Sequence, residues 1–146
     1  MADRGASTSR DYLLVAEQRY DEARYLHDGG RLPGAIYLAG LAVECVLKAL
    51  ILSTPRTPED RGKLSKSIKG GKNGHNLRWL RDKYAEMVGT RITESIDLDL
   101  AVFEGWTVDL RYVSKVPDPD LVRDIFPALE RIFRWARKEA LDESDS

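Results

Sequence analysis

The sequence predicts an all-α fold, an antiparallel bundle of about five helices of which four are long. In five segments the apolar residues recur at intervals of three and four, the spacing that places side chains on one face of a helix. No segment shows the strict alternation of apolar and polar residues that is typical of a half-buried strand. The 146 residues suffice for one domain, expected over residues 9–141, with flexible tails at 1–8 and 142–146.

The first helix is expected over about residues 10–27, with Ser9 as its N-cap. Its apolar stripe consists of Leu13, Ala16, Tyr20 and Ala23. Gly29 and Gly30 follow, and they are expected to end the helix because glycine readily adopts the left-handed backbone conformation found at helix C-termini.

The second helix is expected over residues 32–53, and Pro33 suits its first turn. Of the 18 residues from 35 to 52, 15 are apolar. A helix that is apolar on nearly every side is buried on nearly every side, so this segment is expected to be the central helix of the bundle. Its two charged residues, Glu44 and Lys48, argue against a membrane span.

Residues 53–74 contain two prolines and four glycines and are expected to form a long loop. The segment carries six basic and two acidic residues, a local charge of +4 in a chain of net charge −1. Two interpretations remain, a solvated loop or a loop whose lysines contact phosphate groups. A nucleotide-binding P-loop is excluded, because Gly62 and Lys63 do not complete the GxxxxGK[ST] pattern.

Three further helices follow in the sequence. The third is expected over about residues 76–88 and the fourth over about 92–104. The fifth is expected to open with Asp118 as N-cap and Pro119 as its first residue, and to run to about residue 141. Pro127 lies inside it and predicts a kink or a break, since proline removes a backbone hydrogen bond.

Composition narrows the class of protein. Hydrophobic residues make up 42% and charged residues 32%, which is typical of a globular protein and not of a disordered one. A net charge of −1 argues against a dedicated duplex-DNA binder, which normally carries a basic excess. Cys45, the single cysteine, cannot form an intramolecular disulfide. Because residues 1–10 are polar and lack the apolar core of a signal peptide, a cytoplasmic location without membrane association is expected.

Glu44 and Lys48 are the first candidates for chemistry. They are four residues apart on the most apolar helix and therefore lie on one face. Burying a lone charge is costly. One interpretation is a structural ion pair, and the other is that Glu44 orients a basic residue that lines a cleft.

His75 precedes Asn76 at the start of the third helix, and either residue could cap that helix. The alternative is that His75 acts as a general acid or base, because histidine titrates near neutral pH. No Cys/His cluster, HExxH or GxSxG pattern is present, so no metal or cofactor is expected.

Arg111 and Tyr112 come shortly after Trp106. The guanidinium of arginine suits phosphate because it is planar, always charged and bidentate. The alternative is that Arg111 meets Glu44, with both aromatic residues in the core. The expected ligand or phosphate site thus comprises Glu44, Lys48, Arg111 and Tyr112, and the candidates for catalysis are Arg111 and His75.

Three segments together carry a family resemblance. They are the run from Tyr37 to Leu50 that contains AGLAVECVLKAL, then Gly74-His75-Asn76-Leu77, then Trp106 followed by Leu110-Arg111-Tyr112. In this order they resemble the HEPN domain family over roughly residues 9–140. The resemblance implies a bundle of four or five helices that commonly forms a homodimer. It also implies pairing with a minimal nucleotidyltransferase in a prokaryotic toxin–antitoxin or defence system.

The chain departs from the family in one motif. Many HEPN proteins are metal-independent ribonucleases whose motif is an arginine, four to six residues, then a histidine. Arg111 stands where that arginine is expected, but Val116, Pro117 and Asp118 occupy the histidine positions. A nucleotide- or RNA-associated binding or assembly module is therefore expected rather than an enzyme. The alternatives are a ribonuclease toxin that uses Arg111 and His75, and a structural helical dimer without ligand.

Overall fold

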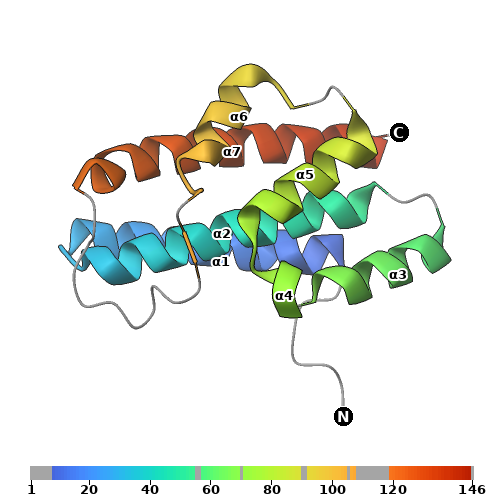
Figure 1. Cartoon of the computed structure of the whole chain (residues 1–146). Helices are drawn as coiled ribbons and strands as arrows, with labels where there is room; N and C mark the ends of the chain where they lie inside the picture. Colours follow the sequence, from blue (N-terminus) through green and yellow to red (C-terminus); the bar gives the residue numbers. More distant parts are fainter. Residues whose placement is uncertain are drawn as a thin grey trace, which may run out of the picture.

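The computed structural model describes residues 8–54, 57–69, 71–89, 92–104, 106–107 and 119–145. Within these ranges every regular element is an α-helix, so the predicted all-α bundle is confirmed. The helices are α1 (Ser9–Asp28), α2 (Leu32–Ser53), α3 (Pro58–Ile68), α4 (Gly71–Gly74), α5 (Leu77–Val88), α6 (Glu94–Ala101) and α7 (Pro119–Asp145). Figure 1 shows α7 and the α1–α2 pair running along the length of the molecule.

Helices α1 and α2 form an antiparallel hairpin that shares the largest helix–helix interface of the described chain. Gly30, with φ of 76°, makes the turn between them, as expected for a residue without a Cβ. The N-cap of α1 is Thr8, whose hydroxyl accepts from the Asp11 amide, so the assignments of Ser9 as cap and of Thr8 to a tail were wrong. The buried stripe begins at Tyr12 rather than at Leu13, which is only partly buried.

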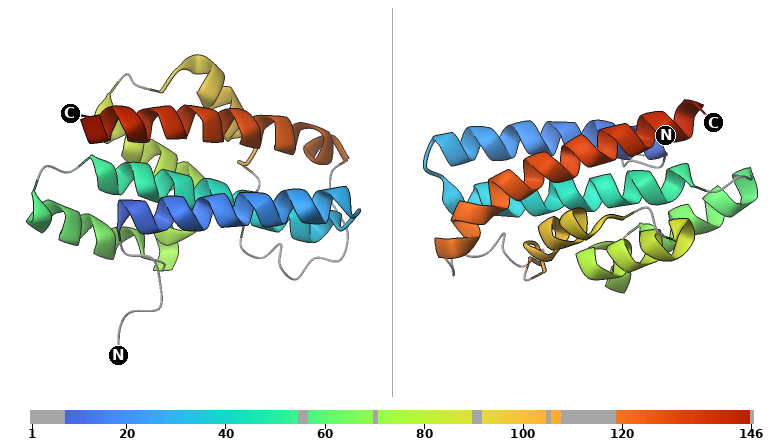
Figure 2. Two further views of the ribbon diagram at one scale, coloured as in Figure 1. Left: turned by 180° about the vertical axis from the view of Figure 1, so that it is seen from behind. Right: turned by 90° about the horizontal axis from the view of Figure 1, so that it is seen from above.

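Helix α2 has the predicted bounds and is the centre of the bundle. It contacts α1, α7, α5 and α3, and 15 of its 22 residues are buried. The views in Figure 2 show it enclosed between α1, α7 and the α5–α6 side of the molecule. It is the one described helix long and apolar enough to cross a membrane, but 83% of its most apolar window is buried inside the protein. Its hydropathy is therefore explained by its place in the core.

The long loop predicted for residues 53–74 was wrong, because most of it folds as α3 and α4. Thr57 caps α3 by accepting a hydrogen bond from the Asp60 amide, and Pro58 is its first residue. Ile68 is fully buried and ties the end of the helix to the core. The sequence contains these start signals, but the prolines and glycines around them are equally typical of a loop.

The remaining helices follow the predicted order with shifted ends. Asn76 caps α5. Helix α6 begins later than expected because Thr93 caps it, and it ends at Ala101 rather than at about residue 104. Helix α7 continues as one helix through Pro127 and reaches residue 145, so the flexible tail predicted from residue 142 was wrong. It packs on α2 and α6 through a fully buried stripe. That stripe includes Ile125, Leu129, Ile132 and Phe133.

Candidate functional site

Glu44 is the centre of a buried polar cluster in the middle of α2. One carboxylate oxygen, Oε2, accepts a hydrogen bond from Lys48 Nζ at 3.0 Å. The other oxygen, Oε1, lies 2.9 Å from His75 Nδ1. The pairing of Glu44 with Lys48 follows from their spacing of four on one helix. His75 comes from 31 residues further along the chain, and only the tertiary fold brings it to Glu44.

Lys48 is enclosed on both sides. Its residue is 4% exposed, as is Glu44, and its ammonium lies 5.6 Å from the centroid of the Tyr12 ring. A cation above an aromatic face is stabilised by the ring quadrupole, so Tyr12 and Glu44 together compensate the buried charge. Sequence reasoning missed Tyr12, because its position on α1 gives no signal of a partner on α2. Buried in this way, Lys48 contributes to the geometry of Glu44 and does not reach the surface where a ligand would lie.

His75 lies between α4 and the cap residue of α5, and its side chain is 45% exposed. Capping belongs to Asn76, whose side chain accepts from the Trp79 amide, so His75 is not needed for that role. Because the Glu44 carboxylate accepts hydrogen bonds, it favours the tautomer in which Nδ1 carries the hydrogen. The neutral ring then leaves Nε2 as an acceptor. A carboxylate-oriented imidazole with an available nitrogen is a recurrent general acid or base.

Arg111 and Tyr112 lie outside the described residues. Trp106, which precedes them, is buried and anchors the chain to α2. Its Nε1 donates to the Tyr37 carbonyl at 3.2 Å, and the two rings stack with centroids 6.1 Å apart. Gly40 makes this approach possible, since a Cβ there would lie 2.0 Å from Trp106 Nε1. Gly40 is one helical turn before Glu44, so the anchor and the polar cluster are neighbours on α2.

Cys45 follows Glu44 on α2 but is not a candidate nucleophile. Burial, and then the neighbouring Glu44 charge, raise the pKa of its thiol to about 12. The reactive form of cysteine is the thiolate, which is nearly absent at neutral pH with such a pKa.

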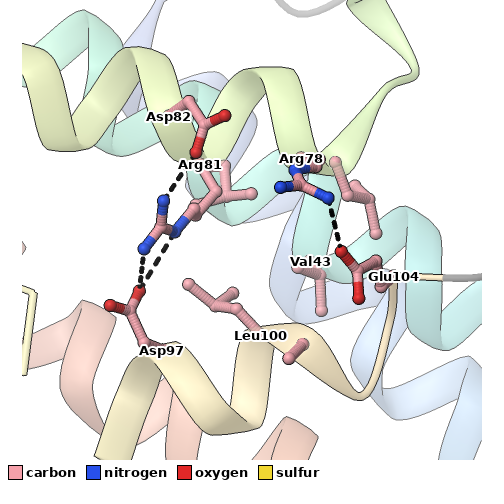
Figure 3. A pocket seen from close by; sticks show the side chains of 10 residues that line it. Val43, Arg78, Arg81, Asp82, Asp97, Leu100 and Glu104 are labelled. Atoms are coloured by element: carbon pink, nitrogen blue, oxygen red, sulfur yellow. Dashed lines mark hydrogen bonds and ion pairs between the residues drawn. The ribbon is translucent and has the colours of Figure 1, made fainter. Parts of the chain in front are cut away.

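A separate pocket of about 220 Å³ lies between α2, α5 and α6. Figure 3 shows Arg81 and Arg78 of α5 pointing toward Asp97 and Glu104, with Val43 and Leu100 also lining the pocket. Arg81 binds Asp97 through Nε and Nη2 at 3.0 and 2.7 Å, and Arg78 binds Glu104 at 2.8 Å. The hydrogen bonds that Arg81 donates to Asp82 and then to Asp97 raise the pKa of Arg81. These guanidinium groups are compensated by carboxylates, so the pocket does not offer an open anion site.

A further ion pair joins α6 to α7. Asp99 is 6% exposed and accepts two hydrogen bonds from Arg131, at 2.9 and 2.8 Å. The pair joins the two helices, since Asp99 lies on α6 and Arg131 on α7. The described chain contains no group of three or more His, Cys, Asp or Glu side chains placed to hold a metal ion.

The fold and the cluster together define a class: an all-α bundle whose central helix carries a buried Glu–Lys pair that holds a half-exposed histidine. Residues 9–139 match the HEPN domain, which is most of the chain. The chain therefore belongs to the HEPN domain family. Comparisons with curated proteins and with solved structures gave no significant match.

Proposed function

We propose that this HEPN protein is a binding module for a phosphate-bearing ligand, a nucleotide or RNA, and that it holds this ligand beside His75. The observation that carries the proposal is the pair of contacts made by Glu44, which fixes a half-exposed imidazole on a buried support. Such rigid support from neighbouring groups is typical of sites that position a ligand.

Each residue has its own role in this proposal. Glu44 orients His75, and Lys48 compensates the charge of Glu44 in the core. His75 donates to a ligand oxygen when it is protonated, and Arg111 binds the phosphate with Tyr112 beside it. The roles of Arg111 and Tyr112 rest on the resemblance to the family and on the anchoring of Trp106 one turn from Glu44.

Fluorescence anisotropy with labelled ATP and a labelled single-stranded RNA, both in EDTA, tests the proposal. His75→Ala and Arg111→Ala are each expected to weaken binding about tenfold, the value of one charge-assisted hydrogen bond. His27→Ala is the matched control, because His27 is similarly exposed but packs against Phe126 at the end of α1. Binding that is equally strong in the wild type, His75→Ala and Arg111→Ala would refute the site.

A second candidate function is metal-independent RNA cleavage. It is favoured by Nε2 of the half-exposed His75, which forms no hydrogen bond with the described residues. In this reaction Nε2 removes the proton of a ribose 2′-hydroxyl, whose oxygen attacks the adjacent phosphorus. The bond from phosphorus to the 5′-oxygen breaks, a 2′,3′-cyclic phosphate forms, and the leaving oxygen takes a proton from solvent. Cyclic phosphate ends produced in EDTA by the wild type and lost in His75→Ala would establish the enzyme. If the RNA stays intact at high protein concentration, cleavage is refuted and the binding module remains as the proposed function.

The partner is part of the same proposal. Resemblance to the family favours a homodimer that pairs with a minimal nucleotidyltransferase. Leu14 and Tyr25 on α1 are exposed apolar residues that such a contact would cover. Co-expression with the product of the neighbouring reading frame, followed by light scattering on a sizing column, tests both points. A monomer that does not bind this product would refute the pairing, and a dimer that binds neither partner nor ligand would indicate a purely structural role.

A further inference from the structure

Three arginines differ from the others in having no partner among the residues that the structure describes. Arg10, Arg31 and Arg61 form no ion pair or side-chain hydrogen bond with other described residues. The other described arginines each bind a carboxylate, except Arg24, which binds the Tyr20 hydroxyl. In a chain with 24 acidic residues, arginines left without an acidic partner are therefore a distinctive feature.

Two of these three arginines, Arg10 and Arg61, line the same cleft. It has a volume of about 490 Å³ and lies where the start of α1, the end of α2 and the side of α3 meet. Figure 1 and the left view of Figure 2 both show the start of α1 beside α3 at this end of the bundle. The volume lies within the range of pockets that hold small-molecule ligands.

The lining of the cleft mixes polar and apolar residues and, among the described residues, contains no carboxylate. Besides the two arginines it includes the hydroxyls of Thr8, Ser9, Ser53 and Ser65. Acidic residues do occur in the first turns of α1 and α3, but none of them lines the cleft. This is the reverse of the pocket between α5 and α6, where carboxylates compensate each arginine.

Hydrogen bonds inside the wall fix its shape. Ser9 Oγ donates to the Ala49 carbonyl at 2.7 Å, which ties the start of α1 to α2. Ser53 Oγ donates to the Leu50 carbonyl at 2.8 Å. Because the hydroxyls of Ser9 and Ser53 donate inward, the charged donors that the described lining offers to a ligand are the guanidinium groups of Arg10 and Arg61.

The geometry points to a phosphate site: we propose that Arg10 and Arg61 bind phosphate groups of the nucleotide or RNA that the protein recognises. Two uncompensated guanidinium groups in one cleft provide charge-assisted, bidentate donors for phosphate oxygens. The cleft adjoins the Glu44 cluster, since Ser9 is bonded to the residue that follows Lys48. The inference extends the proposed function, on which it rests, by adding a second contact surface along α2.

Arg31 provides a matched control. It is also exposed and has no partner in the described part of the chain, but it lies at the turn between α1 and α2, at the opposite end of a 20-residue helix. That helix is about 30 Å long at 1.5 Å per residue. Arg31→Ala removes the same charge as Arg61→Ala without touching the cleft, so it separates a local contact from a change in net charge.

Anisotropy is measured with labelled single-stranded RNA in EDTA over a series of salt concentrations, using Arg10→Ala, Arg61→Ala, their combination and Arg31→Ala. Each cleft variant is expected to weaken binding about tenfold and to lower the salt slope by about 0.7 for each phosphate contact removed. Arg31→Ala should stay within about twofold of the wild type, as expected for a distant surface charge. Thermal melts confirm that the variants are folded. A parallel arm with ATP and inorganic tripolyphosphate distinguishes a free nucleotide from an RNA strand.

The outcomes separate the two proposals. Weaker binding in the cleft variants with no effect of His75→Ala would support the phosphate cleft and refute the site at His75. If His75→Ala loses binding while the cleft variants bind as tightly as Arg31→Ala, the cleft is overturned and the site at His75 stands. Wild-type protein that binds neither RNA, ATP nor tripolyphosphate would overturn both.

Discussion

Replacing Glu44 with glutamine is expected to destabilise the protein because it leaves the buried Lys48 ammonium without its carboxylate partner. Glu44 and Lys48 are each 4% exposed, and their atoms meet at 3.0 Å. Breaking a buried ion pair by removing one partner costs about 3–5 kcal/mol. For a domain of this length, about 2–4 °C of melting temperature is lost per kcal/mol, so the expected shift is about 6–20 °C.

The double variant Glu44→Gln/Lys48→Met tests the physical reason. It removes both charges and keeps side chains of similar size on α2. Replacing both members of a buried pair by groups of matching shape is often close to neutral, so most of the lost stability should return. The partial exposure of His75 means that losing its carboxylate partner adds little to this cost.

Urea unfolding followed by circular dichroism at 222 nm provides the free energies of unfolding for both single variants and the double variant. The three values and that of the wild type form a double-mutant cycle, whose coupling energy is expected to exceed about 2 kcal/mol. Additive single effects would refute the reasoning, and so would a loss below about 1 kcal/mol for Glu44→Gln, the value typical of an exposed pair.

The remaining predictions concern Gly40, Arg131 and Cys45. Gly40→Ala is expected to cost about 1–3 kcal/mol by overpacking, since its Cβ would lie 2.0 Å from Trp106 Nε1; thermal melting measures it. Arg131→Ala is expected to lower the free energy of unfolding in urea by more than the loss of an exposed ion pair, because it leaves the buried Asp99 carboxylate without its donor. Cys45, with a pKa of about 12, is expected to react with a disulfide reagent at pH 8 about a thousandfold more slowly than an ordinary thiol. Because the folded thiol keeps its proton where the unfolded one loses it, stability should fall as the pH rises above about 9.

Each of these predictions has a control within the chain. Gly62 lies in α3 with open space around its Cβ position, so Gly62→Ala should be neutral or stabilising, by up to about 1 kcal/mol. A similar loss in both glycine variants would contradict the argument from Trp106. Arg134→Ala breaks an exposed pair on α7 and should cost less than about 1 kcal/mol. Equal losses for Arg134 and Arg131 would contradict the argument from burial. Urea-unfolded protein provides the reference rate for Cys45, and a native rate equal to it would contradict the raised pKa.

Much of the fold could be predicted because its signals are local. The bounds of α2 follow from a continuous apolar run, and Asn76 caps α5 as its residue type allows. Helix α3 shows the limit of local signals, since the same residues contain helix-start and loop signals. Burial of Ile68 against the core favours the helix, and this contact is not visible in the segment itself.

The candidate site divides in the same way. By itself the sequence determined the helical class, the central helix and the pairing of Glu44 with Lys48, because a helical period relates residues only three or four positions apart. The tertiary structure alone decided that His75 reaches Glu44, that Tyr12 covers Lys48, and that Arg10 and Arg61 share a cleft. These contacts join different helices. Which side chains meet depends on how the apolar faces of the helices pack, and the hydrophobic effect that drives this packing is non-directional, so the pattern of one segment does not reveal its neighbours.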